Sequence, residues 1–478
     1  MDTSMHSDPI ALAPEIALLI SAVLGLLVGA WTPRRRQWIV HALAALACVA
    51  GLAATVVSAT RPDETVFGTY VLDTATHATR AIVLLAVLAL IALCRDTVAG
   101  HKRETEFVVL LQLGALGAIA LAGAGDLIML FAAFLLASVP LYALAGWAKQ
   151  GSATEAALKY YLAGALLGVT TAAGVTVLFG VAGATGYGRV AEGISRGPAA
   201  AAAVGLIAVL AGLAFKAGAV PAHFWVPDVS DGTPPPVAAA LTTVPKIGAL
   251  VALHRLLGTA IPPDVVDWRL LVAVLATASM TLGNLAAFAQ SSVLRLLGYS
   301  TVSQVGYLLM AVAVAGQAPL ARPALLLYLA AYALTNIAAF AVVASTDQRT
   351  LDAYRGLFRR DPLLALALAV ALLGLVGTPP TGVFVGKLEV FTAAVDGGLA
   401  WLVVVAAVNT VASLFYYLRW IAPCFHPAGS ADSDRPADEG APRTANRWAR
   451  GVALTSAALS LLLGLASGVV LTAVGAAG

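Results

Sequence analysis

The stretch that decides the fold lies mid-chain, at residues 199–237: AAAAAVGLIAVLAGLAFKAGAVPAHFWVPDVSDGTPPPV. Its first part is apolar over about 20 residues, the length that a helix needs to cross a bilayer. Pro221 then interrupts the run, because proline removes a backbone donor and clashes with the preceding turn. Broken backbone at membrane depth persists only where protein buries it or where it lines a water-filled cavity. The stretch therefore predicts a broken transmembrane helix inside a larger helical assembly.

The composition of the whole chain agrees with a membrane protein. Of its 478 residues 60% are hydrophobic and 11% are charged, whereas soluble domains carry about 25% charged residues. The net charge of +3 gives no argument for nucleic acid. Cys48, Cys94 and Cys424 are isolated in the sequence, so no disulfide, zinc or iron–sulfur pattern is present. No obvious cleavage site follows the first apolar run, which we interpret as a retained helix.

The hydropathy pattern predicts fourteen spans, and their continuous apolar runs favour helices over a β-barrel. The fold class is thus an all-α polytopic membrane protein. The predicted spans are 10–31, 37–60, 79–94, 107–123, 126–147, 156–184, 199–220, 235–257, 268–289, 293–316, 323–346, 362–396 (interrupted), 399–421 and 451–474.

The distribution of basic residues predicts the orientation. Odd-numbered loops hold seventeen of the 28 Lys and Arg residues, and even-numbered loops hold seven, among them Arg80 and Arg255. Cytoplasmic loops carry the excess of positive charge, so both termini are expected outside. Residues 427–449 are rich in Pro, Gly, Ser and charge, which is typical of a polar linker, and the same count places it in the cytoplasm.

A second broken span predicts an internal repeat. The sequence GTPPTG at 377–382 interrupts the span 362–396. Broken helices in corresponding positions of two halves indicate an inverted repeat and its ion pathway. We expect helices 1–3 over residues 1–105, a first five-helix repeat over 106–258, a second over 259–425, a polar linker over 426–450 and a last helix over 451–478.

Three lysines lie within predicted spans: Lys216, Lys246 and Lys387. A lysine at the centre of a membrane helix costs about 2.5–3.5 kcal/mol. The alternative to a functional role is snorkelling to the interface, an explanation that fits Lys387 better than the other two. Burial disfavours the charged form of a lysine, which makes such a residue a usable proton carrier. We interpret all three as proton-transfer residues.

Other polar groups are weaker candidates. His223 follows the first break and Glu389 follows Lys387 by two residues, so both are candidate relay groups. An interfacial position is the alternative for Glu389, and it is preferred for His254. Asp228 and Asp231 are expected to cap the helix that follows them. The sequence has no nucleotide-binding loop, nucleophile arrangement or metal-ligand cluster, so it indicates ion translocation, with no cofactor or metal bound by this chain.

Eight motifs carry a resemblance to a known family. They are SVPLY (138–142), EAALKYY (155–161), FKAGAVPAHFWVPDV (215–229), TVPKIGA (243–249), GNLAAFAQ (283–290), LRLLGYSTVSQVGY (294–307), TPPTGVFVGK (378–387) and NTVASLFYYLR (409–419). In this order they resemble the proton-pumping antiporter-like membrane subunits of respiratory complex I, within which they are most similar to the subunit N group. The resemblance covers about residues 105–420.

The resemblance implies a fourteen-helix fold with two inverted five-helix repeats, in which Lys216, Lys246 and Lys387 carry protons. It implies a subunit of a translocating NADH:quinone oxidoreductase in a bacterial inner membrane. The NAD, FMN, iron–sulfur and quinone chemistry would then belong to other membrane and peripheral subunits of the assembly, and this chain would carry no redox chemistry.

The sequence departs from the family pattern at three positions. Leu135 stands where the family has a glutamate, Gln304 where it often has a histidine, and Arg295 where it often has a lysine. The loss of the glutamate predicts weaker proton loading of Lys216. Two alternatives stay open: a subunit of a multi-subunit Na+/H+ antiporter, and a non-pumping structural member of either assembly.

Overall fold

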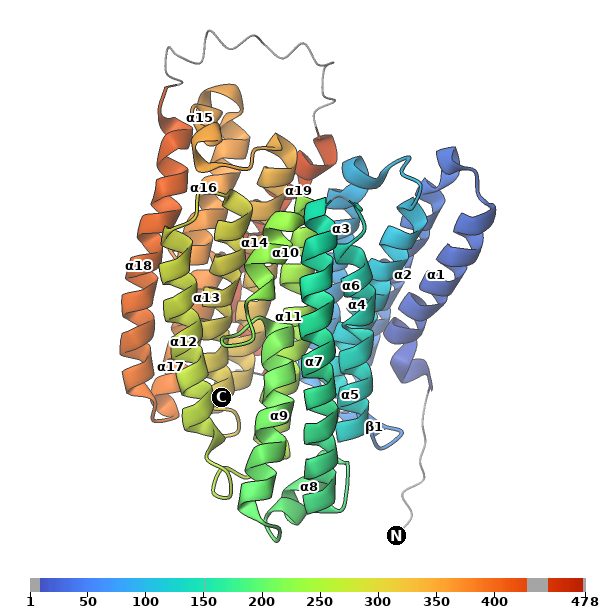
Figure 1. The fold of residues 1–478 in the computed structure, drawn as a ribbon, viewed down its shortest axis with the longest axis vertical. Coiled ribbons are helices and arrows are strands. Elements are labelled where there is room, and N and C mark those ends of the chain that lie inside the picture. The colour runs from blue at the N-terminus through green and yellow to red at the C-terminus, as the bar shows by residue number, and fades with distance from the viewer. Residues whose placement is uncertain (1–8, 150, 428–445, 476–478) are drawn as a thin grey trace.

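The computed structural model describes residues 9–149, 151–427 and 446–475, which are overwhelmingly helical (Figure 1). The helices are α1 (Ala13–Trp31), α2 (Trp38–Ser58), α3 (Thr74–Val98), α4 (Glu104–Gly123), α5 (Leu127–Leu136), α6 (Val139–Ala145), α7 (Gly151–Ala182), α8 (Tyr187–Ile194), α9 (Ala199–Ala217), α10 (Trp225–Gly232), α11 (Pro235–Thr259), α12 (Trp268–Phe288), α13 (Val293–Ala313), α14 (Ala321–Thr346), α15 (Leu357–Arg360), α16 (Pro362–Val376), α17 (Gly382–Asp396), α18 (Ala400–Phe425), α19 (Arg447–Leu465) and α20 (Ser467–Ala473). Strands β1 (Glu64–Val66) and β2 (Tyr70–Leu72) form a short antiparallel hairpin.

The predicted fold class is confirmed. In the described part of the chain, thirteen helical segments are long and apolar enough to cross a membrane, and one of them consists of α5 and α6 together. The predicted span 362–396 consists of two helices of 15 residues each, α16 and α17. The long helices run roughly parallel, with α15 at one end of the bundle and α8 and β1 at the other (Figure 1). Most of the predicted linker 426–450 lies outside the described residues.

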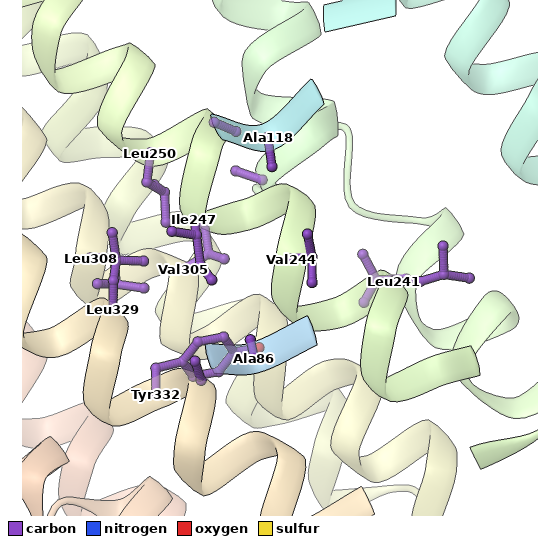
Figure 2. Close-up of a cluster of buried hydrophobic side chains, with 14 of the residues drawn as sticks. Ala86, Ala118, Leu241, Val244, Ile247, Leu250, Val305, Leu308, Leu329 and Tyr332 are labelled. Carbon is purple, nitrogen blue, oxygen red and sulfur yellow. The ribbon is translucent and has the colours of Figure 1, made fainter. Parts of the chain in front are cut away.

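Helix α11 forms the centre of the bundle and is buried along its whole length apart from its last turns. Its Leu241, Val244, Ile247 and Leu250 belong to a buried cluster that also contains Ala86 of α3, Ala118 of α4, Val305 of α13 and Leu329 of α14 (Figure 2). Close packing against α4 requires glycine, since a Cβ at Gly248 would lie 2.2 Å from the backbone oxygen of Ala118. Among the candidate membrane spans of the described residues, α11 is the most buried, and Lys246 projects from it.

Several basic residues that were assigned to loops lie in helices, and two of them, Arg80 and Arg255, form ion pairs between distant elements. Arg80 lies in α3 and is fully buried, and its Nε atom is 2.8 Å from a carboxylate oxygen of Glu15 in α1. Arg255 lies in α11 and is 2.7 Å from Asp73, the residue that caps α3. A buried arginine needs a hydrogen-bonded partner, and hydropathy alone does not reveal one that comes from a distant helix. Both pairs join α3 to other parts of the bundle.

Candidate functional site at the interrupted helices

The three lysines predicted as site residues are all buried. Lys216 lies in the last turn of α9, Lys246 in the middle of α11 and Lys387 in the first half of α17. Their relative exposure is 0%, 0% and 3%, so none of them reaches an interface by snorkelling. Each must therefore find a polar partner inside the bundle.

Lys246 finds its partner at the end of α9. Its Nζ atom donates a hydrogen bond of 2.8 Å to the carbonyl oxygen of Ala217. In a continuous helix this carbonyl would accept from the residue four positions later, but that residue is Pro221, which has no N–H. Gly218 turns the chain with a φ of +80°, and a Cβ there would lie 2.8 Å from the Lys246 nitrogen. Glycine and proline together expose the carbonyl and leave room for the lysine.

Lys387 repeats this arrangement at the end of α16. Its Nζ atom lies 2.8 Å from the carbonyl oxygen of Val376 and 3.4 Å from that of Leu375. The residues four positions later are Pro380 and Pro379, so again no backbone N–H is available. The turn is made by Gly377 with a φ of +89°, and a Cβ there would lie 2.9 Å from the Lys387 side chain.

Lys216 uses a third interruption, which the sequence analysis missed. The predicted span 126–147 is divided into α5 and α6, and Lys216 Nζ donates a 3.0 Å hydrogen bond to the Ala137 carbonyl between them. The backbone N–H of Leu141 bonds to Ser138 instead of Ala137. Pro140, in the first turn of α6, was the available signal, since proline inside a span frees backbone groups.

Helix-terminal carbonyls suit a lysine for an electrostatic reason. The carboxyl end of a helix carries about half a negative charge on its unpaired carbonyls. An unpaired buried carbonyl costs about 1–3 kcal/mol and an unpaired buried lysine costs about 2.5–3.5 kcal/mol. Bringing the two together offsets both costs, without a carboxylate.

No carboxylate takes part in these contacts. Among the ion pairs of the described residues, none involves Lys216, Lys246 or Lys387. Leu135, at the position of the family's glutamate, is 41% exposed on the outer side of α5. The rings of Phe134 and Tyr142 lie near the Lys216 ammonium instead, at 5.2 and 5.7 Å from ring centroid to nitrogen.

Buried polar side chains fill the space between Lys246 and Lys387. The Tyr332 hydroxyl donates to the carbonyl of Thr242, one turn before Lys246, at 2.9 Å. Asn336 donates to the hydroxyls of Thr242 and Thr243 at 3.1 and 2.9 Å. Since Tyr332 and Asn336 are four residues apart, they share one face of α14.

The same face of α14 leads to Lys387. Tyr328, one turn before Tyr332, donates a 2.6 Å hydrogen bond to the side-chain oxygen of Gln304. The Gln304 amide donates at 2.8 Å to the Leu375 carbonyl, which Lys387 also contacts. Gln304 therefore occupies a defined place beside the second interruption.

The weaker candidates are not joined to the lysines. His223 is half-buried between α9 and α10, and no hydrogen bond among the described residues connects it to a lysine. Glu389 is partly exposed on α17 and forms no ion pair with Lys387 in the part of the chain that is described. Their relay roles stay predictions. Within the same residues, no three His, Cys, Asp or Glu side chains gather as a metal site would require.

The predicted capping role of Asp228 and Asp231 was wrong. Helix α11 begins after Pro234 without a side-chain cap. Asp228 instead binds Lys159 of α7 and Arg295 of α13, at 2.9 and 2.8 Å, and Asp231 accepts a hydrogen bond from Ser292. Both aspartates lie inside α10, and the N-cap position of α11 is Pro234, so their carboxylates bind groups on other helices instead.

The ion pairs of Asp228 affect its protonation, and α10 lies outside the candidate membrane spans. Partial burial alone would raise the pKa of Asp228, but the hydrogen bonds from Lys159 and Arg295 outweigh it and hold the pKa below its usual value. The carboxylate thus stays charged near neutral pH and ties α10 to both α7 and α13.

The fold and the site define a class: a multi-span helical membrane protein whose buried lysines bind the carbonyl ends of interrupted helices. Comparison with known proteins then identifies the family. Residues 124–413, more than half of the chain, match the family model described as NADH:quinone oxidoreductase/Mrp antiporter, TM. The chain is 80% identical to NADH-quinone oxidoreductase subunit N 1 of Streptomyces griseus, over the whole of both chains. It is 50% identical to subunit N of Mycobacterium sp. strain JLS, over 96% of this chain and 97% of the relative.

Solved structures agree with this assignment. A chain of respiratory complex I from Thermus thermophilus with bound aureothin is similar with a TM-score of 0.82 and 35% identity, covering 97% of this chain and 100% of that one. The Mrp complex from Dietzia sp. DQ12-45-1b shares the fold, with a TM-score of 0.83 at 22% identity over 98% of this chain and 96% of that one. The chain therefore belongs to the NADH:quinone oxidoreductase/Mrp antiporter transmembrane family, and its relatives place it with the antiporter-like subunit N of complex I.

Proposed function

We propose that this chain translocates protons as a membrane-arm subunit of a proton-translocating NADH:quinone oxidoreductase, a translocase whose redox reaction occurs in other subunits. The observation that carries the proposal is the contact of each buried lysine with a carbonyl exposed by an interrupted helix. NAD and quinone, which the names of the subunit N relatives contain, would be bound by partner subunits, together with the FMN and iron–sulfur clusters that the family resemblance implies.

The first part of the proton path joins Lys216 to Lys246. Lys246 binds the carbonyl of Ala217, the residue that directly follows Lys216, so the end of α9 carries one lysine and is bound by the other. A lysine that gains a proton binds these carbonyls more strongly, because charge-assisted hydrogen bonds are about twice as strong as neutral ones. Proton transfer between the two lysines then changes how firmly α9 is held against α5, α6 and α11.

The second part of the path joins Lys246 to Lys387. A row of polar side chains lies between the two lysines. It begins one turn before Lys246 with Thr242, Thr243 and Asn336. It ends with Tyr328 and Gln304 at the Leu375 carbonyl beside Lys387. Hydroxyl groups both donate and accept hydrogen bonds, so these side chains line the proposed route of proton transfer. Gln304 does not titrate, and its role in the proposal is to hold Tyr328 in place.

The proposal includes the orientation and the repeat. Both termini would lie outside a bacterial inner membrane and residues 427–449 inside, with 106–258 and 259–425 forming inverted repeats. A single cysteine introduced as Gly440→Cys should react with a membrane-impermeant thiol reagent from the cytoplasmic side only. Labelling from outside would contradict the orientation.

One alternative has a specific observation in its favour. A non-pumping structural role fits a Lys216 that has no carboxylate partner among the described residues and a Leu135 in place of an acid. A role in a multi-subunit Na+/H+ antiporter rests on the shared fold with the Mrp complex alone.

The experiment that tests the proposal removes Lys246. In the purified complex reconstituted into liposomes, Lys246→Ala should lower proton translocation per quinone reduced by at least roughly tenfold, because a proton relay contributes at least that much. Lys102→Ala, a lysine exposed in a loop, is the matched control and should change nothing. Unchanged pumping in a fully assembled Lys246→Ala complex would support the structural role instead.

A further inference from the structure

The three lysines share carbonyl partners but differ in a second contact. The ammonium nitrogen of Lys387 lies 3.8 Å from the centroid of the Tyr307 ring. That of Lys216 lies 5.2 Å from the Phe134 ring and 5.7 Å from the Tyr142 ring. All of these are within the distance of about 6 Å at which an aromatic face attracts a cation. Lys246 is absent from the cation–ring contacts of the described residues.

An aromatic face distinguishes the two states of a lysine. The ring quadrupole attracts an ammonium cation and offers much less to a neutral amine. A carbonyl oxygen accepts a hydrogen bond from either state, although more strongly from the charged one. The ring is therefore the contact that depends most on whether the proton is present.

Burial makes these rings effective. Phe134 and Tyr307 are fully buried, and a cation–ring attraction is strongest where water is excluded. Both rings are also fixed by their surroundings: Phe134 packs in the main hydrophobic cluster and the Tyr307 hydroxyl accepts a hydrogen bond from Thr410 at 3.2 Å. Neither ring needs to move to face its lysine.

We infer that aromatic rings take the place of a carboxylate in this protein, with Phe134 and Tyr142 holding the proton on Lys216 and Tyr307 holding it on Lys387. Lys246, which binds a carbonyl and has no ring contact among the described residues, then releases its proton more readily than the other two lysines. The rings do not exchange protons themselves; they stabilise the protonated form of Lys216 and of Lys387. This inference rests on the proposed proton translocation and explains how it operates without an acid beside Lys216.

The test changes the electronics of the Phe134 ring and leaves its size nearly unchanged. Phe134 is replaced, by suppression of a stop codon, with 4-fluoro-, 3,5-difluoro- and 3,4,5-trifluorophenylalanine in the complete complex. Each fluorine weakens the negative ring face. Proton translocation per quinone reduced should fall stepwise through the series, by roughly tenfold at the last member. The loss should be smaller at acidic pH, where a higher proton concentration refills Lys216.

Phe340 provides the control. It is equally buried, in α14 and within the same hydrophobic cluster, and its fluorinated series should leave translocation unchanged. A flat series at position 134, alongside a Lys216→Ala variant that does not pump, would overturn the inference and leave the proposed function intact. If Lys216→Ala pumps normally, the proposed function fails and the inference fails with it.

Tyr307 gives an independent test at the second lysine. Tyr307→Phe keeps the ring face and removes the hydroxyl, so pumping should stay within about twofold of the original. Tyr307→Leu removes the ring and should lower pumping by roughly tenfold. Equal losses in the two variants would assign the effect to the hydroxyl and overturn the inference at this site.

Discussion

The interruptions bound by Lys246 and Lys387 both expose backbone carbonyls that need a donor, but the donor comes from a different place in each. After α9 the exposed carbonyl of Ala217 is bound by Lys246 from a separate helix, α11. After α16 the exposed carbonyls are bound by Lys387 from α17, the continuation of the same span. The first interruption therefore joins elements distant in sequence, whereas the second is closed locally. We expect a disturbance at the first to spread further through the bundle.

The interruption between α5 and α6, which Lys216 binds, differs from the one between α16 and α17 in the number of side-chain donors. The Leu375 carbonyl keeps Gln304 as a donor if Lys387 is removed. The Ala137 carbonyl has Lys216 as its side-chain donor between α5 and α6. An orphaned buried carbonyl costs about 1–3 kcal/mol. Loss of Lys216 should therefore destabilise its surroundings more than loss of Lys387 does.

The largest expected effect is that of Lys216→Ala. Pumping should fall by at least roughly tenfold, since the variant removes a proposed relay group and the contact between α9 and the α5–α6 interruption. In Lys387→Ala, pumping should fall less, because Gln304 still binds the Leu375 carbonyl at the interruption between α16 and α17. Initial rates of proton uptake in proteoliposomes measure both. Equal losses would show that the α5–α6 interruption depends on its lysine no more than the α16–α17 interruption does.

A smaller effect is expected from Gln304→Leu. This variant leaves the Tyr328 hydroxyl without its acceptor and takes one donor from the Leu375 carbonyl. The loss of a buried hydrogen bond should slow translocation roughly threefold to tenfold. Tyr328→Phe, which removes the other half of the same contact, should give a similar loss, and the double variant should add little. Full additivity would show that the two residues act separately.

Asp228→Asn is expected to change stability more than pumping. The ion pairs to Lys159 and Arg295 are partly exposed, so their removal should cost about 1 kcal/mol. Because the pKa of Asp228 is lowered in the folded protein, its contribution is present above the usual value of 3.8 and is lost as the pH falls below it. In detergent, the variant should unfold at a lower temperature than the original protein at neutral pH. In acid, the two unfolding temperatures should become equal. A constant difference would exclude Asp228 as the titrating group.

The smallest effect is expected from Leu135→Glu. The family resemblance suggests that an acid at this position would strengthen proton loading of Lys216, but the Leu135 side chain is exposed on α5, whereas Phe134 faces the lysine. We expect pumping to stay within about twofold of the original in complexes that assemble, because the added acid would point away from Lys216; assembly is measured alongside, since an acidic side chain within a span is costly. A clear rise in protons translocated per electron pair would show that the acid reaches Lys216 after all.

Much of the fold was predictable because hydrophobic length is a local property. Continuous apolar runs identified the membrane spans, and the prolines at 221, 379 and 380 marked where helices end. The burial of Lys216, Lys246 and Lys387 was also predictable, since each is a lone cation within an apolar run. A membrane imposes these rules on every segment separately, so they can be read without knowing the neighbours.

The partners of those lysines were decided only by the tertiary structure. The sequence does not indicate that Lys216 meets the Ala137 carbonyl, 79 residues away, or that Asp228 binds Lys159 and Arg295 instead of capping α11. Backbone carbonyls and ring faces are present everywhere in a sequence, and they become specific partners only when packing brings them to a buried cation. The sequence by itself determined which residues need a partner, and the packing of distant helices decided which partner each one has.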